Sequence, residues 1–438
     1  MPGTGKTTTI ASIISALVAR GKSVFLTSYT HTAVDNLLLK LKDEKIDFVR
    51  IGSKDRVHPG IVEFTADSQD NLTTVQATED YFNSKPVVAT TCLGISQCVL
   101  HPRLSIDIAP YTLFFSPIFL KRKFDYCIVD EASQITLPVC LGPLRFCDTF
   151  ILVGDHYQLP PIVKSNTAKI MGLQVSLFKR LSEAHPEAVV NLEHQYRMNS
   201  DIMLLSNTLI YDYKLRCGTP QVADWVLDIP NIDGLEAAHR NLPAVPGRPC
   251  DWDRKCWLRD LLAPKCVLSI HYKGRTLINF CSRKVVFVDT DQVPALDVKL
   301  GELVQNQTEA TLVYQTVEAF HSCGIQEEQI GVISPYRSQL KLIKNLLQSR
   351  TNIEIHTVDK YQGRDKDCIL VSLVKSNLKG NIGDLLKDWR RINVAFTRAR
   401  KKLIIFGSRS TLKSSNLFLT FFEMMENKQW VRLVFLKA

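Results

Sequence analysis

Long uninterrupted apolar runs are missing from this 438-residue sequence. The densest apolar stretch, Ile106 to Leu120, is interrupted by Asp107, Pro110 and Pro117, and no run of about 18 apolar residues occurs elsewhere. A membrane-spanning protein is therefore excluded. The sequence also has no basic segment followed by an apolar one at its start, so no secretory signal is expected.

Closely spaced cysteine pairs are scarce as well. The twelve cysteines are scattered along the chain, and several lie in apolar strand-like runs, which favours reduced thiols over a disulfide framework. Cys250, Cys256, Cys266 and Cys281 are separated by five, nine and fourteen residues. Because these spacings contain no C-x₂₋₄-C pair, a zinc site is not expected.

What the sequence does have is an ordinary globular composition with a basic excess. Hydrophobic residues make up 45% and charged residues 22%, and the length predicts two or three domains. Lysine and arginine number 54 against 44 acidic residues, giving a formal charge of +10. This balance favours a polyanionic partner, with nucleic acid as the leading candidate.

Apolar runs of strand length alternate with helical stretches in both halves of the chain, which indicates parallel sheets wrapped by helices. The expected strands are Ser23–Thr27, Val87–Thr90, Tyr126–Val129, Phe150–Val153, Val285–Val288, Ile330–Ser334, Ile353–Thr357, Ile369–Leu373 and Leu403–Phe406. The prediction is an α/β protein with one domain over 1–190 and a second over 191–438. Residues 213–284, which hold six prolines, are expected to form an irregular insertion.

The start of the chain has the pattern of a phosphate-binding loop. Pro2-Gly3-Thr4-Gly5-Lys6-Thr7-Thr8 precedes the apolar helical stretch Ile10–Val18. In such loops backbone N–H groups surround the phosphates, while Lys6 would reach the β and γ oxygens and Thr7 would ligate Mg²⁺. The full pattern needs a glycine one position before Met1 and a preceding strand, and the sequence has neither. A chance glycine turn is the alternative when this motif is taken alone. The predicted nucleotide-binding residues are Gly3, Thr4, Gly5, Lys6, Thr7 and Thr8.

A second motif supports the same chemistry. The near-continuous apolar run 124–129 ends in Asp130-Glu131-Ala132-Ser133, which places two carboxylates at the carboxyl end of a strand. Asp130 is predicted to hold Mg²⁺, and Glu131 to polarise the attacking water.

Through these motifs and those described next, the chain resembles a superfamily 1 helicase of the 5′-to-3′ branch, in which two RecA-like domains bind ATP. The segment 153–161, Val-Gly-Asp-His-Tyr-Gln-Leu-Pro-Pro, is similar to the motif whose glutamine senses the γ-phosphate, which implies that role for Gln158. Segments 195–199 and 393–400 resemble the family's two arginine fingers, which implies Arg197 and Arg398. An arginine that contacts the transferred phosphoryl group can accelerate hydrolysis by about 10³ to 10⁵. An ordinary salt bridge is the alternative for either arginine.

Three further segments resemble the family's nucleic-acid track. They are 27–36, 89–92 and 357–365, and hydroxyl and amide donors there would hold the backbone of one strand without base preference. The resemblance implies nucleic-acid contacts for Ser28, Thr30, His31, Thr32, Asn36, Thr90, Thr91, Gln362 and Gly363. Asp365 is expected near the nucleotide ribose. The alternative is that these residues only cap helices at strand ends.

Within this branch, the chain is most similar to the helicase part of the nuclease-helicases that process Okazaki-fragment flaps and resect broken DNA ends. Residues 26–36, 153–156, 358–366 and 385–391 carry that similarity. It implies a translocating DNA helicase that uses ATP and Mg²⁺, acts on single-stranded and 5′-flap DNA, and works with a single-strand-binding protein and replication or repair factors. It also implies a nucleus location, with the mitochondrion as a second compartment.

The departures from the family suggest a fragment of a longer protein. The nuclease domain and its [4Fe-4S] cysteines, N-terminal in the family, are expected outside this chain, and without the strand before the loop we expect weak ATP turnover and aggregation from an open sheet edge. A nuclease-like Asp297-Val298-Lys299 pattern is assigned no role. Two rivals stay open: a helicase acting on RNA, and a nucleic-acid-binding module without turnover.

Overall fold

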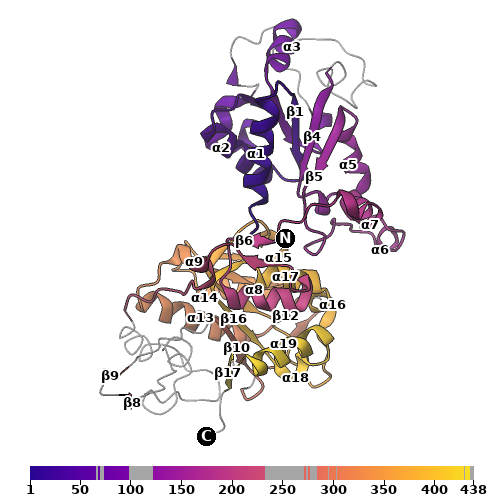
Figure 1. Cartoon of the computed structure of the whole chain (residues 1–438). Coiled ribbons are helices and arrows are strands. Elements are labelled where there is room, and N and C mark those ends of the chain that lie inside the picture. The colour runs from indigo at the N-terminus through magenta and orange to yellow at the C-terminus, as the bar shows by residue number, and fades with distance from the viewer. Residues whose placement is uncertain are drawn as a thin grey trace. The chain divides into compact units, whose positions relative to one another are not determined.

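The computed structural model describes residues 1–65, 68–69, 74–97, 122–231, 271–272, 275–276, 284–293, 295–301, 303–428 and 430–434. The chain divides into two compact units, Gly3–Leu192 and Glu193–Ala438 (Figure 1). The apolar run 108–120 and the four cysteines considered for zinc lie outside the described residues. In the described part of the chain, none of the helices is long and apolar enough to cross a membrane.

The first unit is built on a five-stranded sheet whose strands all pair in parallel, in the order β2-β3-β1-β4-β5. The strands are β1 (Val24–Ser28), β2 (Phe48–Arg50), β3 (Val87–Thr91), β4 (Phe124–Asp130) and β5 (Cys147–Leu152). The first three strands are buried along their whole length, which explains why they read as continuous apolar runs rather than alternating ones.

Helices cover both faces of this first sheet (Figure 1). Its α-helices are α1 (Lys6–Val18), α2 (His31–Asp43), α3 (Val75–Ser84), α5 (Leu137–Leu144), α6 (Asn166–Ile170) and α7 (Leu177–Ala184). Its 3₁₀ turns are Lys54–Arg56, Pro59–Phe64, Gly94–Gln97, Ala132–Gln134 and Pro186–Ala188. Within β1, Val24 and Leu26 pack in the core that contains residues of α1 and α2, while Phe25 packs in the core on the other face.

The second unit has a six-stranded parallel sheet in the order β14-β13-β15-β16-β10-β17. Its strands are β10 (Val285–Asp289), β13 (Ile330–Ile333), β14 (Glu354–His356), β15 (Lys366–Ser372), β16 (Ala399–Gly407) and β17 (Val431–Val434). Three short strand pairs complete the unit: β6 (His194–Gln195) with β7 (Arg216–Cys217), β8 (His271–Tyr272) with β9 (Arg275–Thr276), and β11 (Val298–Leu300) with β12 (Leu303–Gln305).

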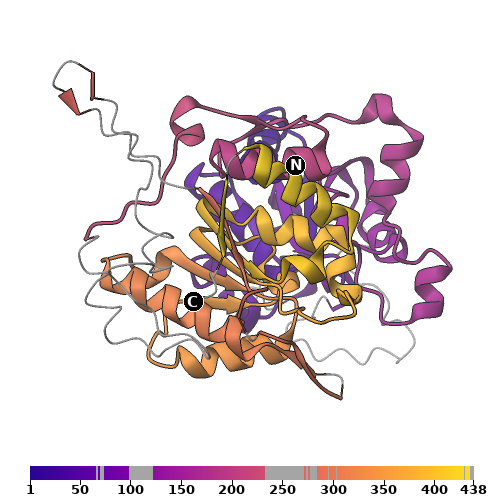
Figure 2. The same cartoon turned by 90° about the horizontal axis from the view of Figure 1, so that it is seen from below.

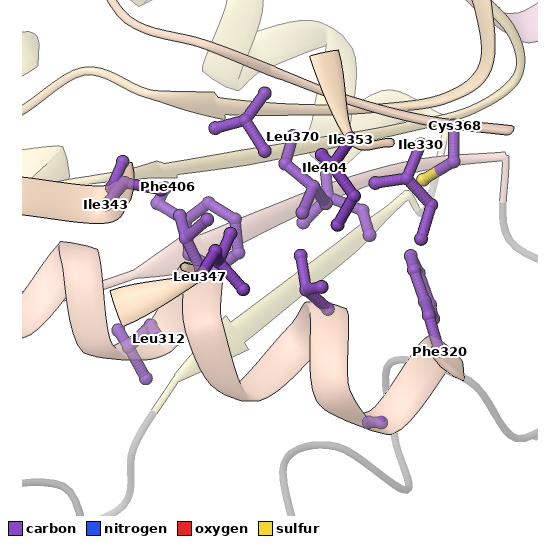
Figure 3. Close-up of a cluster of buried hydrophobic side chains, with 14 of the residues drawn as sticks. Leu312, Phe320, Ile330, Ile343, Leu347, Ile353, Cys368, Leu370, Ile404 and Phe406 are labelled. Carbon is purple, nitrogen blue, oxygen red and sulfur yellow. The ribbon is translucent and has the colours of Figure 1, made fainter. Parts of the chain in front are cut away.

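Helices flank the second sheet on both faces (Figure 2). They are α8 (Ser200–Ser206), a π-helical turn (Asn207–Tyr211), α9 (Pro220–Ala223), α13 (Gln307–Ser322), the 3₁₀ turn Glu327–Gln329, α14 (Arg337–Leu346), α15 (Val358–Tyr361), α16 (Gly383–Lys387), α17 (Trp389–Phe396), α18 (Arg409–Leu412) and α19 (Asn416–Asn427). On one face, Leu312 and Phe320 of α13 pack with Leu370 and Ile404 of the sheet (Figure 3). On the other face, Phe287 of β10 contacts two phenylalanines of α19.

The predicted fold class, α/β with parallel sheets, is confirmed. Each of the nine expected strands overlaps an observed one, with ends that differ by up to four residues. The division at 190/191 stays a prediction. Within 213–284, the described residues form β7, α9, β8 and β9.

Candidate functional site

The turn that precedes α1 has the backbone of a phosphate-binding loop. Gly3 and Gly5 have left-handed φ angles of 69° and 76°, a conformation that suits glycine. Gly5 is the N-cap of α1 and provides no side-chain cap, so the first N–H groups of the helix are left for another acceptor. Lys6 donates from Nζ to the carbonyl oxygen of Met1 over 2.9 Å, which holds the ammonium group across this turn.

The three predicted threonines of the loop differ in their surroundings. Thr4 is buried and donates from Oγ1 to the carbonyl of Met1 over 2.9 Å. Thr7 is half-buried, and Thr8 is exposed and accepts from Nζ of Lys40 over 2.6 Å. Of the three, Thr7 alone has no side-chain hydrogen bond within the described part of the chain, so its hydroxyl at the helix start is available to a metal ion.

Asp130 is the last residue of β4 and Glu131 follows it directly, as the motif predicts. Asp130 is 6% exposed, and its Oδ1 accepts from the backbone N of Glu131 over 2.9 Å. Burial and the neighbouring Glu131 charge raise the pKa of Asp130 to about 7, against the influence of Lys6. Glu131 has a left-handed φ of 51°, a strained conformation typical of functional positions. A divalent cation would favour the ionised form of this buried carboxylate.

Gln158 lies in the loop after β5 and is already tied to Asp155. Its Nε2 donates to Oδ2 of Asp155 over 2.8 Å, and Gln158 is 5% exposed. The backbone N of Asp155 donates to Oγ of Ser133 in the loop that follows Asp130 and Glu131. This contact links Gln158 to the acidic pair through two short loops, but its role as a γ-phosphate sensor stays a prediction.

The pairing of the first sheet places three predicted residues side by side. Ser28, the last residue of β1, pairs with Thr91 of β3 on one side and with Asp130 of β4 on the other. Ser28 is fully buried, and its Oγ has no hydrogen-bond partner among the described residues. An unsatisfied buried hydroxyl is costly unless a ligand completes it. This row brings a predicted nucleic-acid contact within one strand of the predicted metal ligand.

Of the other predicted nucleic-acid contacts of the first unit, two already accept hydrogen bonds at helix starts and two are exposed. Thr30 caps α2 by accepting from the N of Ala33, and Thr91 accepts from the N of Gly94. Thr32 and Asn36 on α2 are exposed. The hydroxyls of Thr30 and Thr91 thus accept hydrogen bonds at helix starts, as the alternative interpretation expected. Contact with nucleic acid stays a prediction for Thr30, Thr32, Asn36 and Thr91.

In the second unit, Asp365 binds two arginines. Oδ2 of Asp365 lies 2.8 Å from Nε of Arg197, and Oδ1 pairs with Arg400. Burial would raise the pKa of Asp365, but Arg197 and Arg400 hold it below its ordinary value. The sequence motifs did not single out Arg400, which is the second residue of β16.

Arg398 is held inside the second unit. It is 1% exposed, and its guanidinium donates to the carbonyl of Val394 and to Oγ1 of Thr397, each over 2.9 Å. The predicted arginine finger would therefore have to leave the end of its own helix before it could contact a phosphate. Its catalytic role stays a prediction.

Gln362 and Gly363, the predicted contacts after α15, have the features of an open site. Both side-chain amide atoms of Gln362 are buried without a hydrogen-bond partner among the described residues. Gly363 has a left-handed φ of 82°, and a Cβ at this position would meet nothing within 4 Å. An amide with both of its polar atoms unsatisfied indicates a missing ligand.

Asp297 has a structural role that the sequence could not reveal. It accepts from Nζ of Lys375, from the N of Ser376 and from Nδ2 of Asn377, over 2.9 to 3.1 Å. These bonds hold a tight turn in which Val374 has a left-handed φ of 71°. The nuclease-like pattern around Asp297 is thereby explained without catalysis. Over the described ranges, no group of three or more His, Cys, Asp or Glu side chains is placed to hold a metal ion.

Two family models match this chain, and both are described as an AAA domain. One matches residues 173–410, more than half of the chain, and the other matches 1–77 and 68–166. The chain therefore belongs to this AAA-domain family.

Curated relatives narrow the identification. The chain is 45% identical over 417 residues to the DNA replication ATP-dependent helicase/nuclease DNA2 of Xenopus laevis, a match that covers 94% of the chain and 35% of that protein. It is 44% identical over 411 residues to the protein of the same name from Homo sapiens, covering 93% and 35%. The resemblance predicted from the motifs is confirmed, since the chain is homologous to the helicase region of these proteins. The chain spans about a third of the length of these relatives.

Solved helicase structures give a more distant likeness. The arterivirus nonstructural protein 10 helicase is 14% identical with a TM-score of 0.43, and the match covers 96% of this chain and 60% of that one.

Proposed function

We propose that the chain is an ATP-driven motor that moves 5′ to 3′ along single-stranded DNA and unwinds duplexes, as the helicase part of a DNA replication and repair helicase/nuclease. The observation that carries the proposal is the row of Thr91, Ser28 and Asp130 across three neighbouring strands. It puts a buried carboxylate with a raised pKa one strand away from a buried hydroxyl that lacks a partner.

Mg²⁺ is the cofactor that fits Asp130, at one end of this row. Magnesium prefers hard oxygen ligands and is usually bound by one or two carboxylates together with substrate phosphates. Asp130 and the hydroxyl of Thr7 would hold it. When bound, it would neutralise charge on the ATP phosphates.

The residues of the chain would divide the work on ATP between them. The N–H groups at the start of α1 and the Lys6 ammonium bind the phosphates, and Glu131 orients the attacking water. In this proposal Arg197 and Arg398 stabilise the charge that develops in the transition state. Because Arg197 is paired with Asp365, its engagement would require that ion pair to open.

Single-stranded DNA is the proposed track. The relatives' printed names include DNA replication, and the unpaired polar atoms of Ser28 and Gln362 support contacts with a polar ligand. The net charge of +10 favours a phosphate backbone. From the same resemblance we propose 5′-flap DNA as a substrate, a single-strand-binding protein as a partner, and the nucleus or mitochondrion as the location. The [4Fe-4S] cluster would belong to the nuclease part of the longer protein.

A matched unwinding assay tests the proposal. Duplexes with 5′ single-stranded tails of DNA or RNA are incubated with ATP and Mg²⁺, and the displaced strand is measured. We expect unwinding and stimulated ATP turnover with the DNA tail from the longer helicase/nuclease of which the chain is proposed to be a part, and only weak turnover from the 438-residue chain alone. A strong preference for the RNA tail would mean that the substrate is RNA and not DNA. Binding of either tail without ATP turnover would favour a nucleic-acid-binding module.

A further inference from the structure

Arg50, the last residue of β2, belongs to none of the motifs discussed above, yet its side chain is fully buried. Its guanidinium contacts three partners, two side chains of α2 and the backbone of the residue that follows β2. Nε donates to Oδ1 of Asp35 over 2.8 Å, NH1 donates to the carbonyl of Ile51 over 2.6 Å, and NH2 lies 3.0 Å from Nδ1 of His31. This forked geometry is specific to arginine, because lysine offers one ammonium group for all three positions.

The contact with Arg50 decides which nitrogen of His31 carries the proton. A guanidinium has donors and no acceptor, so Nδ1 of His31 must accept, and the neutral ring then carries its proton on Nε2. Burial and the nearby Arg50 charge lower the pKa of His31, although Asp35 opposes them. His31 is therefore a neutral imidazole whose Nε2–H is a hydrogen-bond donor.

Arg50 also connects His31 with the second predicted contact segment of the first unit. The carbonyl of Ile51, which accepts from NH1 of Arg50, accepts from Oγ1 of Thr90 as well, over 3.0 Å. His31 starts α2, whereas Thr90 lies near the end of β3. One buried cation thus joins two segments that are 59 residues apart in the chain.

The charge of Arg50 is balanced on its far side. Asp35 lies one helical turn after His31 on α2, and its second oxygen, Oδ2, accepts from the backbone N of His58 over 2.9 Å. Asp35 therefore fixes the guanidinium against α2 and leaves NH2 for His31. A buried ion pair by itself adds little stability compared with apolar packing, so the specific geometry is the feature that needs a reason.

We propose that Arg50 is a positioning residue for the nucleic-acid track of the first unit: it holds His31 in the Nε2–H form, as a donor to a backbone phosphate of single-stranded DNA, and fixes Thr90 through the shared carbonyl. This inference rests on the proposed function, because it assigns Arg50 to the track that the motor would follow.

The tautomer is measured first, on the unmodified 438-residue chain. With ¹⁵N-labelled histidine, long-range ¹⁵N–¹H correlation distinguishes protonation on Nδ1 from protonation on Nε2. We expect the Nε2–H form for His31 at pH 7.5, whereas the exposed His185, whose Nδ1 lies 3.3 Å from a carboxylate oxygen of Glu187, should carry a proton on Nδ1. A proton on Nδ1 of His31 would overturn the proposal without any variant having to fold.

Binding of a fluorescent oligodeoxythymidine then tests the coupling. His31→Ala should weaken binding about tenfold, the loss of one hydrogen bond to a charged group, and Arg50→Lys should weaken it at least as much, because Arg50 also fixes Thr90. The double variant should bind no more weakly than Arg50→Lys alone. Independent, multiplying losses would contradict the positioning role. Arg350→Lys is the control, since it alters another arginine that forks onto a carboxylate, Glu318, in the second unit.

The two hypotheses fail in different ways. If the unmodified chain does not bind the oligonucleotide, the proposed function is wrong whatever the tautomer of His31. If it binds and the two variants act independently, the function stands and the role of Arg50 is wrong.

Discussion

The carboxyl edge of the first sheet and the amino edge of the second sheet differ in how far their charged groups are already paired. In the first unit, Asp130 is buried beside Glu131 and forms no ion pair with the described residues. In the second unit, Asp365 is bound to two arginines, and Arg398 donates to its own helix. The first edge is thus prepared for a cation and a phosphate, whereas the second must give up existing bonds before its arginines can act.

The largest effect is expected on ATP hydrolysis at the carboxyl edge of the first sheet. Glu131→Gln should lower ATP turnover about a thousandfold, because an amide cannot accept a proton from water, while binding of a fluorescent ATP analogue persists. Single-turnover hydrolysis measures the change. Asp125→Asn, at the opposite end of the same strand, is the control and should keep normal turnover. Normal turnover by Glu131→Gln would remove the water-positioning role.

The next largest effect is expected on stability, at a tightly packed glycine in the core of the second unit. A Cβ on Gly331 would lie 1.9 Å from the hydroxyl of Tyr361, which is itself buried without a partner among the described residues. Gly331→Ala should cost about 3 kcal/mol of unfolding free energy by overpacking, measured by urea denaturation.

A second variant identifies the cause. Tyr361→Phe removes a hydroxyl that forms no hydrogen bond, so its own stability should be unchanged or slightly higher. In combination with Gly331→Ala it should recover part of the loss, because the added Cβ would still lie 2.8 Å from Cδ1 of Ile369 and 2.9 Å from Cζ of the ring at 361. If it recovers none, the clash is not with this hydroxyl.

A third prediction concerns Glu309, a fully buried carboxylate on α13 of the second unit. Burial raises its pKa from the ordinary 4.5 to about 8, although it accepts hydrogen bonds from Ser372 and Val374. The folded state therefore holds its proton more tightly than the unfolded state, and this contribution to stability is lost as pH rises from about 5 to about 8. The expected slope is at most about 1.4 kcal/mol per pH unit.

Glu309→Gln should flatten this part of the pH profile, because a glutamine does not titrate. Urea denaturation at pH 6, 7 and 8 compares the two proteins. An unchanged slope would mean that another group titrates over this range, and the raised pKa of Asp130 makes that residue of the first unit the first one to test.

The smallest effect is expected at an edge of the first sheet. β5 pairs with β4 alone among the described strands, and Phe150 on it is 45% exposed. Phe150→Lys should reduce self-association in light scattering while changing stability by less than about 0.5 kcal/mol. Leu378→Lys, at a 98% exposed leucine outside any strand, is the control. An equal reduction from both would show that general apolar exposure, not strand pairing, drives association.

The sequence was sufficient wherever a feature depends on neighbouring residues. The strand before Asp130 and the glycine turn before Lys6 were predicted because apolar runs and left-handed glycines are local signals. The order of the strands was not predictable, since it depends on which crossovers pack together. The network around Arg50 joins residues 31, 35, 50, 51, 58 and 90, and only a charged residue at the end of the short buried run 48–51 hinted at it.

The hydrogen bonds and ion pairs that the predicted arginine fingers form inside the second unit could not be predicted from the sequence either. Motif spacing singles out Arg398, two residues after α17, but it does not show that the guanidinium donates to the carbonyl of Val394 within that helix. Likewise, the pairing of Arg197 with Asp365 joins residues 168 positions apart.

The position of Ser28 beside Asp130 has a mechanical consequence. Paired backbones in a sheet are about 4.8 Å apart and cannot slide without breaking several hydrogen bonds at once. A shift of the β4 backbone at Asp130 would therefore carry the β1 backbone at Ser28 with it. In the proposed motor, force would pass sideways through these paired strands, from the predicted metal ligand to the predicted nucleic-acid contact.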